Sequence, residues 1–178
     1  MADSEIRKGA VTMKGNPFDL VGPQLKTGDP APDFTCVGAG MAVIKLGDTA
    51  GKPRLFNVVP SLDTPVCNLQ TRHFSQVLTE LGDKVAAYTV SLDLPFAQAR
   101  WCKDANVENV KNLSDVHDQS FGKHYGVLIQ GLPIALLARA VFVVDADNTI
   151  KYIEVVPEIG SEPNYAPALE ALKTAAGV

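Results

Sequence analysis

From Leu55 to Cys67 the chain reads LFNVVPSLDTPVC: an apolar run, a turn, and the beginning of a helical pattern. The apolar run predicts a buried strand that ends at Pro60. From Cys67 to Leu81 apolar residues recur at helical spacing, and Gly82 follows as a stop signal. The stretch therefore predicts a strand, a turn and a helix in direct succession, and this unit sets the pattern for the chain that follows.

The alternation of strands and helices continues to the C-terminus. Further strands are predicted at 85–92, 110–113, 140–145 and 149–156, and further helices at 95–105, 118–125 and 162–174. Asp93 and Ser161 are the candidate N-caps of two of these helices. An alternating order implies a mainly parallel sheet with helices on both faces, and the turn at 146–148 adds an antiparallel hairpin. The pattern predicts an α/β protein with a thioredoxin-like fold, in which helices flank a central mixed sheet.

The N-terminal residues differ from this pattern. Residues 1–23 carry turn formers between short apolar pieces, which predicts a β-hairpin arm packed on a main domain of residues 24–178. At 178 residues one domain is the expected number. The same residues show no basic region followed by an apolar core, so we expect no secretory signal.

Composition excludes several classes of protein. With 46% hydrophobic and 20% charged residues, the chain is neither a disordered protein, a collagen nor a small disulfide-stapled domain. The net charge of −4, with no cluster of basic residues, argues against a nucleic-acid partner, because phosphates bind to clustered Lys and Arg.

Two further observations concern the compartment. The apolar stretch 127–144 is interrupted by Gly131, Pro133 and Arg139, so we interpret it as a loop that leads into a buried strand and expect no membrane partner. An odd, small number of cysteines, three, suits a reducing compartment better than a disulfide framework. We therefore expect a cytoplasmic protein.

Cys67 lies in the first turn of the predicted helix 67–81. Pro65 fits the first helical position, and Asp63 or Thr64 would cap the helix. The unpaired N–H groups and the dipole of a helix N-terminus stabilise a negative charge, so this position favours the thiolate, which is the nucleophilic form of cysteine. Thr64 would direct its hydroxyl at the sulfur or at an oxygen bound beside it.

Two more residues are candidates for the same site. Arg139 precedes the apolar strand on the face of residues 141 and 143, where a cation needs an anionic partner. That partner is either a thiolate or a structural Asp or Glu, and position alone does not decide. Cys102 is either a packed helical cysteine or a second thiol that closes a disulfide with Cys67. A disulfide needs Cα atoms about 4.4–6.8 Å apart, so it would require local unwinding of one or both helices.

These segments resemble a known family. Residues 60–67 match the peroxiredoxin pattern Pro-x-x-x-Thr-x-x-Cys. The segments 93–102, DLPFAQARWC, and 138–141, ARAV, are similar to those of the bacterial thiol peroxidase subfamily, which consists of atypical two-cysteine peroxiredoxins. The likeness runs from about residue 15 to the C-terminus. The chain departs from the subfamily at Trp101, where Phe is usual, and at Cys36, which matches no functional position and is expected to be an incidental thiol.

The resemblance implies a role for each residue of the site. Cys67 would be the peroxidatic cysteine, which becomes a sulfenic acid, and Cys102 the resolving cysteine, which converts it into an intramolecular disulfide. Thr64 and Arg139 would hold and polarise the peroxide, and Pro60 would shield the sulfenate from solvent. The family also implies hydrogen peroxide and organic (alkyl) hydroperoxides as substrates, thioredoxin as reductant, a homodimer, and no metal or organic cofactor.

Three alternatives use the same residues differently. A metal site is disfavoured because no cysteines lie close together in the sequence and no two histidines have the i, i+4 spacing. A cysteine hydrolase would need His117 or His124 as a base beside Cys67. A thioredoxin-fold redox sensor or partner-binding protein would keep the cysteines without catalytic turnover.

Overall fold

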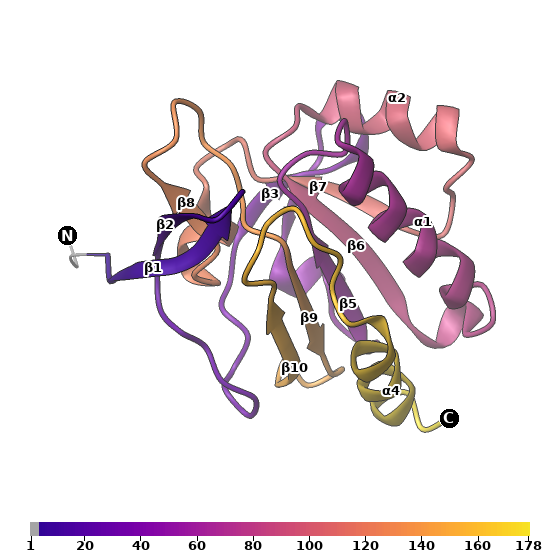
Figure 1. Cartoon of the computed structure of the whole chain (residues 1–178). Coiled ribbons are helices and arrows are strands. Elements are labelled where there is room, and N and C mark those ends of the chain that lie inside the picture. Colours follow the sequence, from indigo (N-terminus) through magenta and orange to yellow (C-terminus); the bar gives the residue numbers. More distant parts are fainter. Residues whose placement is uncertain (1–3) are drawn as a thin grey trace.

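The computed structural model describes residues 4–178, so the first three residues of the predicted arm lie outside the described part (Figure 1). The helices are α1 (Pro65–Leu78), α2 (Pro95–Ala105), α3 (Ser120–His124) and α4 (Tyr165–Ala175). The strands are β1 (Ile6–Met13), β2 (Asn16–Val21), β3 (Thr35–Val37), β4 (Val43–Lys45), β5 (Arg54–Val58), β6 (Ala86–Ser91), β7 (Lys111–Ser114), β8 (Leu128–Gln130), β9 (Ala140–Val144) and β10 (Ile150–Val155).

The main sheet has seven strands in the order β10-β9-β5-β6-β7-β3-β4. The neighbours β5, β6 and β7 run parallel, whereas β9 is antiparallel to both β5 and β10. The predicted mixed sheet is thus confirmed, with the strand–turn–helix unit of β5 and α1 at its centre. A thioredoxin-like arrangement follows, with helices on both faces of the sheet.

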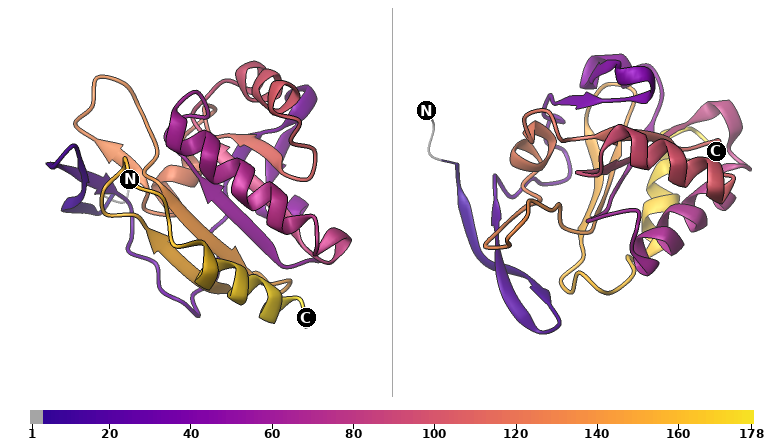
Figure 2. Two further views of the ribbon diagram at one scale, coloured as in Figure 1. Left: turned by 45° about the vertical axis from the view of Figure 1, so that its right-hand side comes forward. Right: turned by 90° about the horizontal axis from the view of Figure 1, so that it is seen from above.

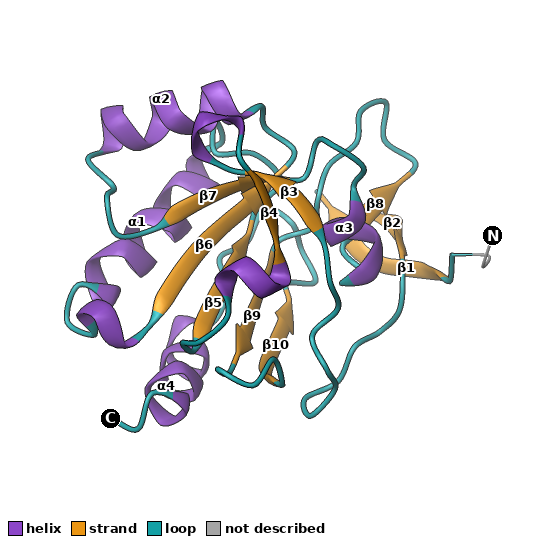
Figure 3. Ribbon diagram, turned by 180° about the vertical axis from the view of Figure 1, so that it is seen from behind, coloured by secondary structure: helices purple, strands orange, loops and turns teal. Residues whose placement is uncertain are grey.

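The two faces of the sheet bury different cores. Phe74 of α1 and Leu172 of α4 pack with Leu55 and Val143 on one face. On the other face, α3 contributes Phe121 to an aromatic cluster that includes Phe56 of β5, with ring centroids 5.6 Å apart. Figure 3 shows α3 on the side of the sheet opposite α1 and α4. Both faces of β5 are therefore covered, and all five of its residues are buried.

The N-terminal β-hairpin belongs to a second, small sheet. Strands β1 and β2 pair with each other, and β2 also pairs with β8. Figure 2 shows this hairpin lying beside the main body rather than within it. Strand β8 falls within 127–144, which we had interpreted as a loop, so that interpretation was wrong for three residues. The boundary between an arm of 1–23 and a domain of 24–178 stays a prediction.

Two further expectations were wrong in detail, and two short strands were missed. Helix α1 begins at Pro65 and ends at Leu78, because residues 79–81 form a turn before a short 3-10 helix that begins at Gly82. Helix α4 begins at Tyr165 after Asn164, so Ser161 is no cap. Strand β3 and the edge strand β4 were not predicted at all. They are three residues long and lie among glycines and short 3-10 turns, so they carry little periodic signal.

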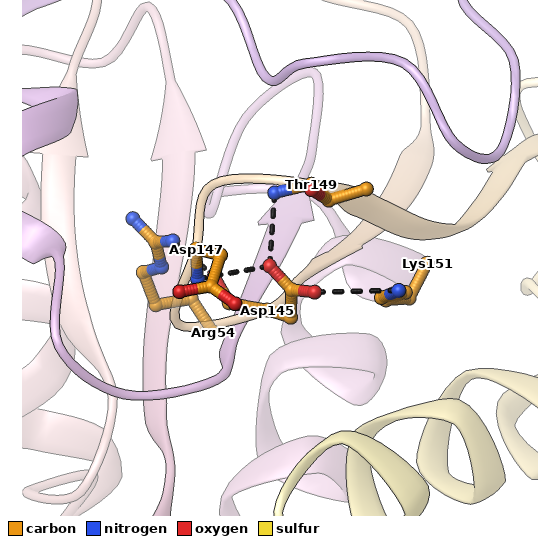
Figure 4. A network of polar contacts seen from close by, with 5 residues as sticks. All are labelled: Arg54, Asp145, Asp147, Thr149 and Lys151. Carbon is orange, nitrogen blue, oxygen red and sulfur yellow. Dashed lines mark hydrogen bonds and ion pairs between the residues drawn. The ribbon is translucent and has the colours of Figure 1, made fainter.

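A buried cation fixes the predicted hairpin of β9 and β10 to the sheet. The guanidinium of Arg54, on β5, donates to the hydroxyl of Thr49 at 3.0 Å, to the side chain of Asn148 at 2.7 Å, and to the backbone carbonyl of Asp145. The carboxylate of Asp145 in turn accepts backbone N–H groups of the turn and pairs with Lys151 at 3.3 Å (Figure 4). Arg54 thereby joins the turn at Thr49 and strand β5 to the β9–β10 turn, which lies more than 90 residues away in sequence.

Arg54→Met should destabilise the protein by about 3 kcal/mol, because it leaves several buried acceptors without a donor. Urea denaturation measures the free energy of unfolding. Lys151→Ala is the matched control, since it breaks an ion pair whose lysine is 46% exposed and should cost less than about 1 kcal/mol. Equal losses in the two variants would contradict the interpretation.

Candidate active site

Cys67 is the third residue of α1 and is fully buried. Thr64 precedes the helix with extended backbone, and Pro65 occupies the first helical position as predicted. The first bond of the helix runs from the N–H of Asn68 to the carbonyl of Thr64, at 3.0 Å. The backbone N–H of Cys67 therefore belongs to the first turn, which lacks helical acceptors and stabilises negative charge.

Arg139 lies immediately before β9 and is 2% exposed. Its Nη1 donates to the sulfur of Cys67 at 3.3 Å, and its Nε donates to the carbonyl of Ile159 at 2.8 Å. Among the described residues no Asp or Glu forms an ion pair with Arg139. Of the two partners left open by the sequence, the structure places the cysteine beside the guanidinium.

A chain of buried amides holds Arg139 in place. The Oε1 of Gln70 accepts from Arg139 at 2.8 Å, and the Nε2 of Gln70 donates to the Oδ1 of Asn57 on β5. Asn57 in turn donates to the hydroxyls of Thr71, at 2.9 Å, and Thr89, at 3.1 Å. These four side chains are fully buried. These hydrogen bonds fix the orientation of each side-chain amide, so the guanidinium of Arg139 faces the oxygen of Gln70 and not its nitrogen.

Sequence reasoning missed Gln70 and Asn57. The inward face of α1 consists of Cys67, Gln70, Thr71, Phe74 and Leu78, whereas the apolar Leu69 is 54% exposed. The signal was available: residues three and four positions after Cys67 share its helix face, so polar residues there lie beside the sulfur.

The N-terminal hairpin supports Arg139 from the other side. The N–H of Ile159 donates to the carbonyl of Thr12 at 2.9 Å, and the N–H of Thr12 donates to Pro157 at 2.7 Å. Between them, the carboxylate of Glu158 accepts the hydroxyl of Thr12 at 2.6 Å and the N–H of Lys14 at 3.0 Å. The carbonyl that binds Arg139 is thus fixed to β1.

The loop that joins β5 to α1 covers Cys67. Pro60 is buried, and Leu62 is 2% exposed and clusters with Val59 and Cys67. Thr64 is exposed, and its hydroxyl donates to the carbonyl of Ser61 at 2.9 Å instead of capping the helix or contacting the sulfur. Thr64 therefore occupies the N-cap position, as one of the two expected candidates, but it lacks the side-chain capping bond, and Asp63 is not the cap.

Cys102 lies on α2 and is not bonded to Cys67; both thiols are free. The side chain of Asn112 on β7 donates to the Cys102 sulfur at 2.9 Å. Burial raises the pKa of Cys102, and the hydrogen bond from Asn112 opposes this rise. The preceding residue, Trp101, packs against the cluster that contains Cys67. The two neighbouring residues of α2 thus have different surroundings.

Cys36 and the histidines take other partners. Burial raises the pKa of the Cys36 thiol strongly, and its sulfur lies 3.7 Å from the carboxylate of Asp115, which raises the pKa further. The ring of His73 stacks on Tyr165 with centroids 3.9 Å apart, and His124 bonds to a backbone carbonyl. Within residues 4–178 no histidine is hydrogen-bonded to Cys67, so a hydrolase would lack its base.

Comparisons with known proteins agree with this fold and site. The redoxin family pattern matches residues 26–169. A thiol peroxidase of Halalkalibacterium halodurans is 50% identical over 166 residues, which cover 93% of this chain and 98% of that protein. A thiol peroxidase of Bacillus subtilis is 47% identical over 163 residues, with 92% and 96% covered. A peroxiredoxin-like protein from Aquifex aeolicus superposes with a TM-score of 0.87 at 39% identity, covering 95% of this chain and 99% of that one.

The fold and the buried cysteine at a helix start define a thioredoxin-like redox protein. The chain belongs to the redoxin family, and within it the relatives make it a peroxidase of the peroxiredoxin type, similar to bacterial thiol peroxidases. None of the helices in residues 4–178 has the length and apolar character needed to span a membrane.

Arg139→Ala should slow the reaction of Cys67 with one equivalent of hydrogen peroxide at least tenfold at neutral pH. The guanidinium donates to the sulfur at 3.3 Å and stabilises the negative charge that the sulfur passes to the peroxide oxygen, and the alanine variant lacks this cation. Stopped-flow fluorescence of Trp101 measures the rate. Arg100→Ala removes an exposed cation of α2 and should leave the rate unchanged. A normal rate in Arg139→Ala would show that Arg139 is only structural.

The attachment of the hairpin should depend on pH. The hydrogen bond from Thr12, with those from Lys14, Gly15 and Gly160, lowers the pKa of Glu158 to about 2. Because this pKa is below that of the unfolded chain, about 4.3, the contribution of Glu158 to stability is complete above pH 4.3 and is lost as the pH falls towards 2. Thermal unfolding of Glu158→Gln should therefore show a shallower loss of stability than wild type over that interval. Parallel curves for the two proteins would contradict the assignment.

Proposed function

We propose that this protein reduces hydrogen peroxide and organic (alkyl) hydroperoxides to water and alcohols through Cys67, Cys102 and thioredoxin. The observation that carries the proposal is the contact between Arg139 and the Cys67 sulfur inside a buried site, at 3.3 Å. A buried guanidinium beside a sulfur favours the thiolate, and water that would screen this interaction is excluded.

In the first step the Cys67 thiolate attacks the nearer peroxide oxygen. The S–O bond forms as the O–O bond breaks, which gives a cysteine sulfenic acid and releases an alkoxide or hydroxide that takes up a proton. Arg139 stabilises the negative charge that moves from sulfur to oxygen. Thr64, whose hydroxyl must turn away from the Ser61 carbonyl, would donate to the peroxide, and the buried ring of Pro60 would keep solvent from the sulfenate.

In the second step the Cys102 thiol attacks the Cys67 sulfenic acid, forming a disulfide and releasing water. On α2, Trp101 packs against the cluster that contains Cys67, whereas the sulfur of Cys102 is bound by Asn112 on β7. We therefore expect local unwinding to precede this step. Leaving its buried position would also lower the pKa of Cys102 towards its ordinary value and increase its nucleophilic thiolate form. The dithiol of thioredoxin would then reduce the disulfide.

Two further features belong to the proposal. Large apolar side chains are exposed at the start of α2, where Leu94 is 54% and Phe96 is 69% exposed, and these favour a homodimer with an interface near the site. The free state of all three cysteines suits the reducing cytoplasm.

Cys102→Ser should consume about one equivalent of peroxide per chain and then stop, whereas wild type turns over with thioredoxin and NADPH-dependent thioredoxin reductase. Without Cys102 the sulfenic acid has no resolving thiol. Mass spectrometry after one equivalent of peroxide should show a Cys67–Cys102 bond in wild type and none in the variant.

Cys36→Ser is the matched control, since Cys36 is remote from Cys67 in the structure and should be dispensable. Cys67→Ser should consume no peroxide, because an alcohol does not ionise near neutral pH. Wild-type turnover in Cys102→Ser would assign resolution to another thiol. Slow turnover in wild type, with the disulfide still formed, would instead favour the redox-sensor alternative.

A further inference from the structure

The side chain of Asp93 has a role that capping of α2 does not explain. Helix α2 begins after Leu94, and the carboxylate of Asp93 points back to the loop that precedes Cys67. Its Oδ1 accepts the hydroxyl of Ser61 at 2.7 Å, and its Oδ2 accepts the backbone N–H of Leu62 at 2.8 Å and the hydroxyl of Ser91 at 2.8 Å. Asp93, which was expected to cap α2, instead joins the loop after β5 to the loop after β6 through its carboxylate.

The backbone of Asp93 is fixed as firmly as its side chain. The hydroxyl of Ser114, at the end of β7, donates to the carbonyl of Asp93 at 2.6 Å. The buried amide of Gln98, on α2, donates to the hydroxyl of Ser91 at 3.0 Å and to the carbonyl of Leu113 at 3.1 Å. The ends of the three parallel strands β5, β6 and β7 therefore meet at Asp93.

This position connects the two cysteines. The loop held by Asp93 leads directly into the helix of Cys67, and the helix that starts one residue after Leu94 carries Cys102. A cleft of about 310 Å³ lies between the loop and α2, lined by Leu62, Asp93 and Trp101 among others. For Cys67 and Cys102 to approach within disulfide distance, the loop, the helix or both must move away from this arrangement.

We infer that Asp93 is a positioning residue that holds the site in its closed, peroxide-reducing form and so limits the rate of disulfide formation. The inference rests on the proposed function. Hydrogen bonds to the carboxylate stabilise the closed form only, so their loss raises the population of the open form from which the disulfide forms.

The ratio of the closed form to the open form also determines which reaction the Cys67 sulfenic acid undergoes. It either condenses with Cys102, which gives the disulfide and water, or reacts with a second hydroperoxide, which gives a sulfinic acid and water or an alcohol. A tighter closed form leaves more time for the second reaction. Asp93 is therefore expected to set the sensitivity of Cys67 to over-oxidation.

The test separates the two chemical steps. Trp101 is the one tryptophan of the chain and packs against the cluster that contains Cys67, so stopped-flow fluorescence follows both steps. Asp93→Ala should raise the peroxide-independent rate of disulfide formation about tenfold, while the rate of the peroxide-dependent step does not rise. In parallel, mass spectrometry should find about tenfold less sulfinic Cys67 at a given excess of hydrogen peroxide.

Three further variants make the result specific. Asp93→Asn keeps an oxygen for Leu62 and Ser91 and offers an N–H to the Ser61 oxygen, so it should stay within about threefold of wild type. Ser61→Ala removes one of the three bonds and should shift both readouts in the same direction as Asp93→Ala, but less. Asp104→Ala removes an exposed carboxylate that lines the same cleft and should change neither.

Each outcome bears on the inference. Unchanged or slower disulfide formation in both Asp93→Ala and Ser61→Ala overturns it, as does an equal effect of Asp104→Ala. If Asp93→Ala does not fold, Ser61→Ala alone decides. If wild type forms no Cys67–Cys102 bond, the proposed function fails and the inference with it, whereas a normal wild-type disulfide with unresponsive variants overturns only the role of Asp93.

Discussion

The structure depends on the placement of one buried cation, Arg139, against the sulfur of Cys67. Transfer of a guanidinium from water into the protein interior costs several kcal/mol of free energy unless the group is paired and hydrogen-bonded. Here the sulfur, the Oε1 of Gln70 and the carbonyl of Ile159 satisfy it. Two of these acceptors lie on helix α1 and the third follows β10, so the site forms only when helix α1, strand β9 and the residues after β10 are packed together.

The hydrogen bonds that hold Arg139 in place extend to the central strands β5 and β6 of the sheet. Gln70 is oriented by Asn57 on the central strand, and Asn57 by hydroxyls of α1 and β6. On the opposite side the N-terminal hairpin fixes the backbone around Ile159. A substitution in the hairpin or in the middle of the sheet can therefore alter the environment of a sulfur that it does not touch. Rigid elements hold the side of the site that contains Cys67.

The side of the site that contains Cys102 is built differently. The Cys102 sulfur accepts one side-chain hydrogen bond, from Asn112, and the loop over Cys67 is held by the carboxylate of Asp93. A few polar contacts at the ends of the parallel strands are easier to break than a packed core, because local opening takes place where buried apolar contacts are few. The proposed reaction needs both properties, a rigid site for the attack on peroxide and a loop and helix that open for the disulfide.

The sequence predicted the regular elements best where periodicity was strong. The strand at β5, the following helix and the β9–β10 hairpin were found, because apolar spacing and turn residues are local signals. The strands β3, β4 and β8 were missed because each has only three residues, and because β3 and β8 also pair with strands that are distant in sequence. On α1 hydrophobicity alone does not decide which residue is buried: Leu69 is exposed, whereas Gln70 is buried because its side chain binds Arg139 and Asn57.

The sequence by itself determined which chemical groups are present and which of them begin a helix or end a strand, since these are matters of neighbours in the chain. That is why a cysteine in a first helical turn and an arginine before an apolar strand could be singled out. Only the tertiary structure decided that the arginine meets that cysteine rather than a carboxylate, and that Asp93 turns back to the loop rather than capping its helix. Cys67 and Arg139 are 72 residues apart, and contacts at that separation depend on the order in which strands pair, which no local pattern encodes.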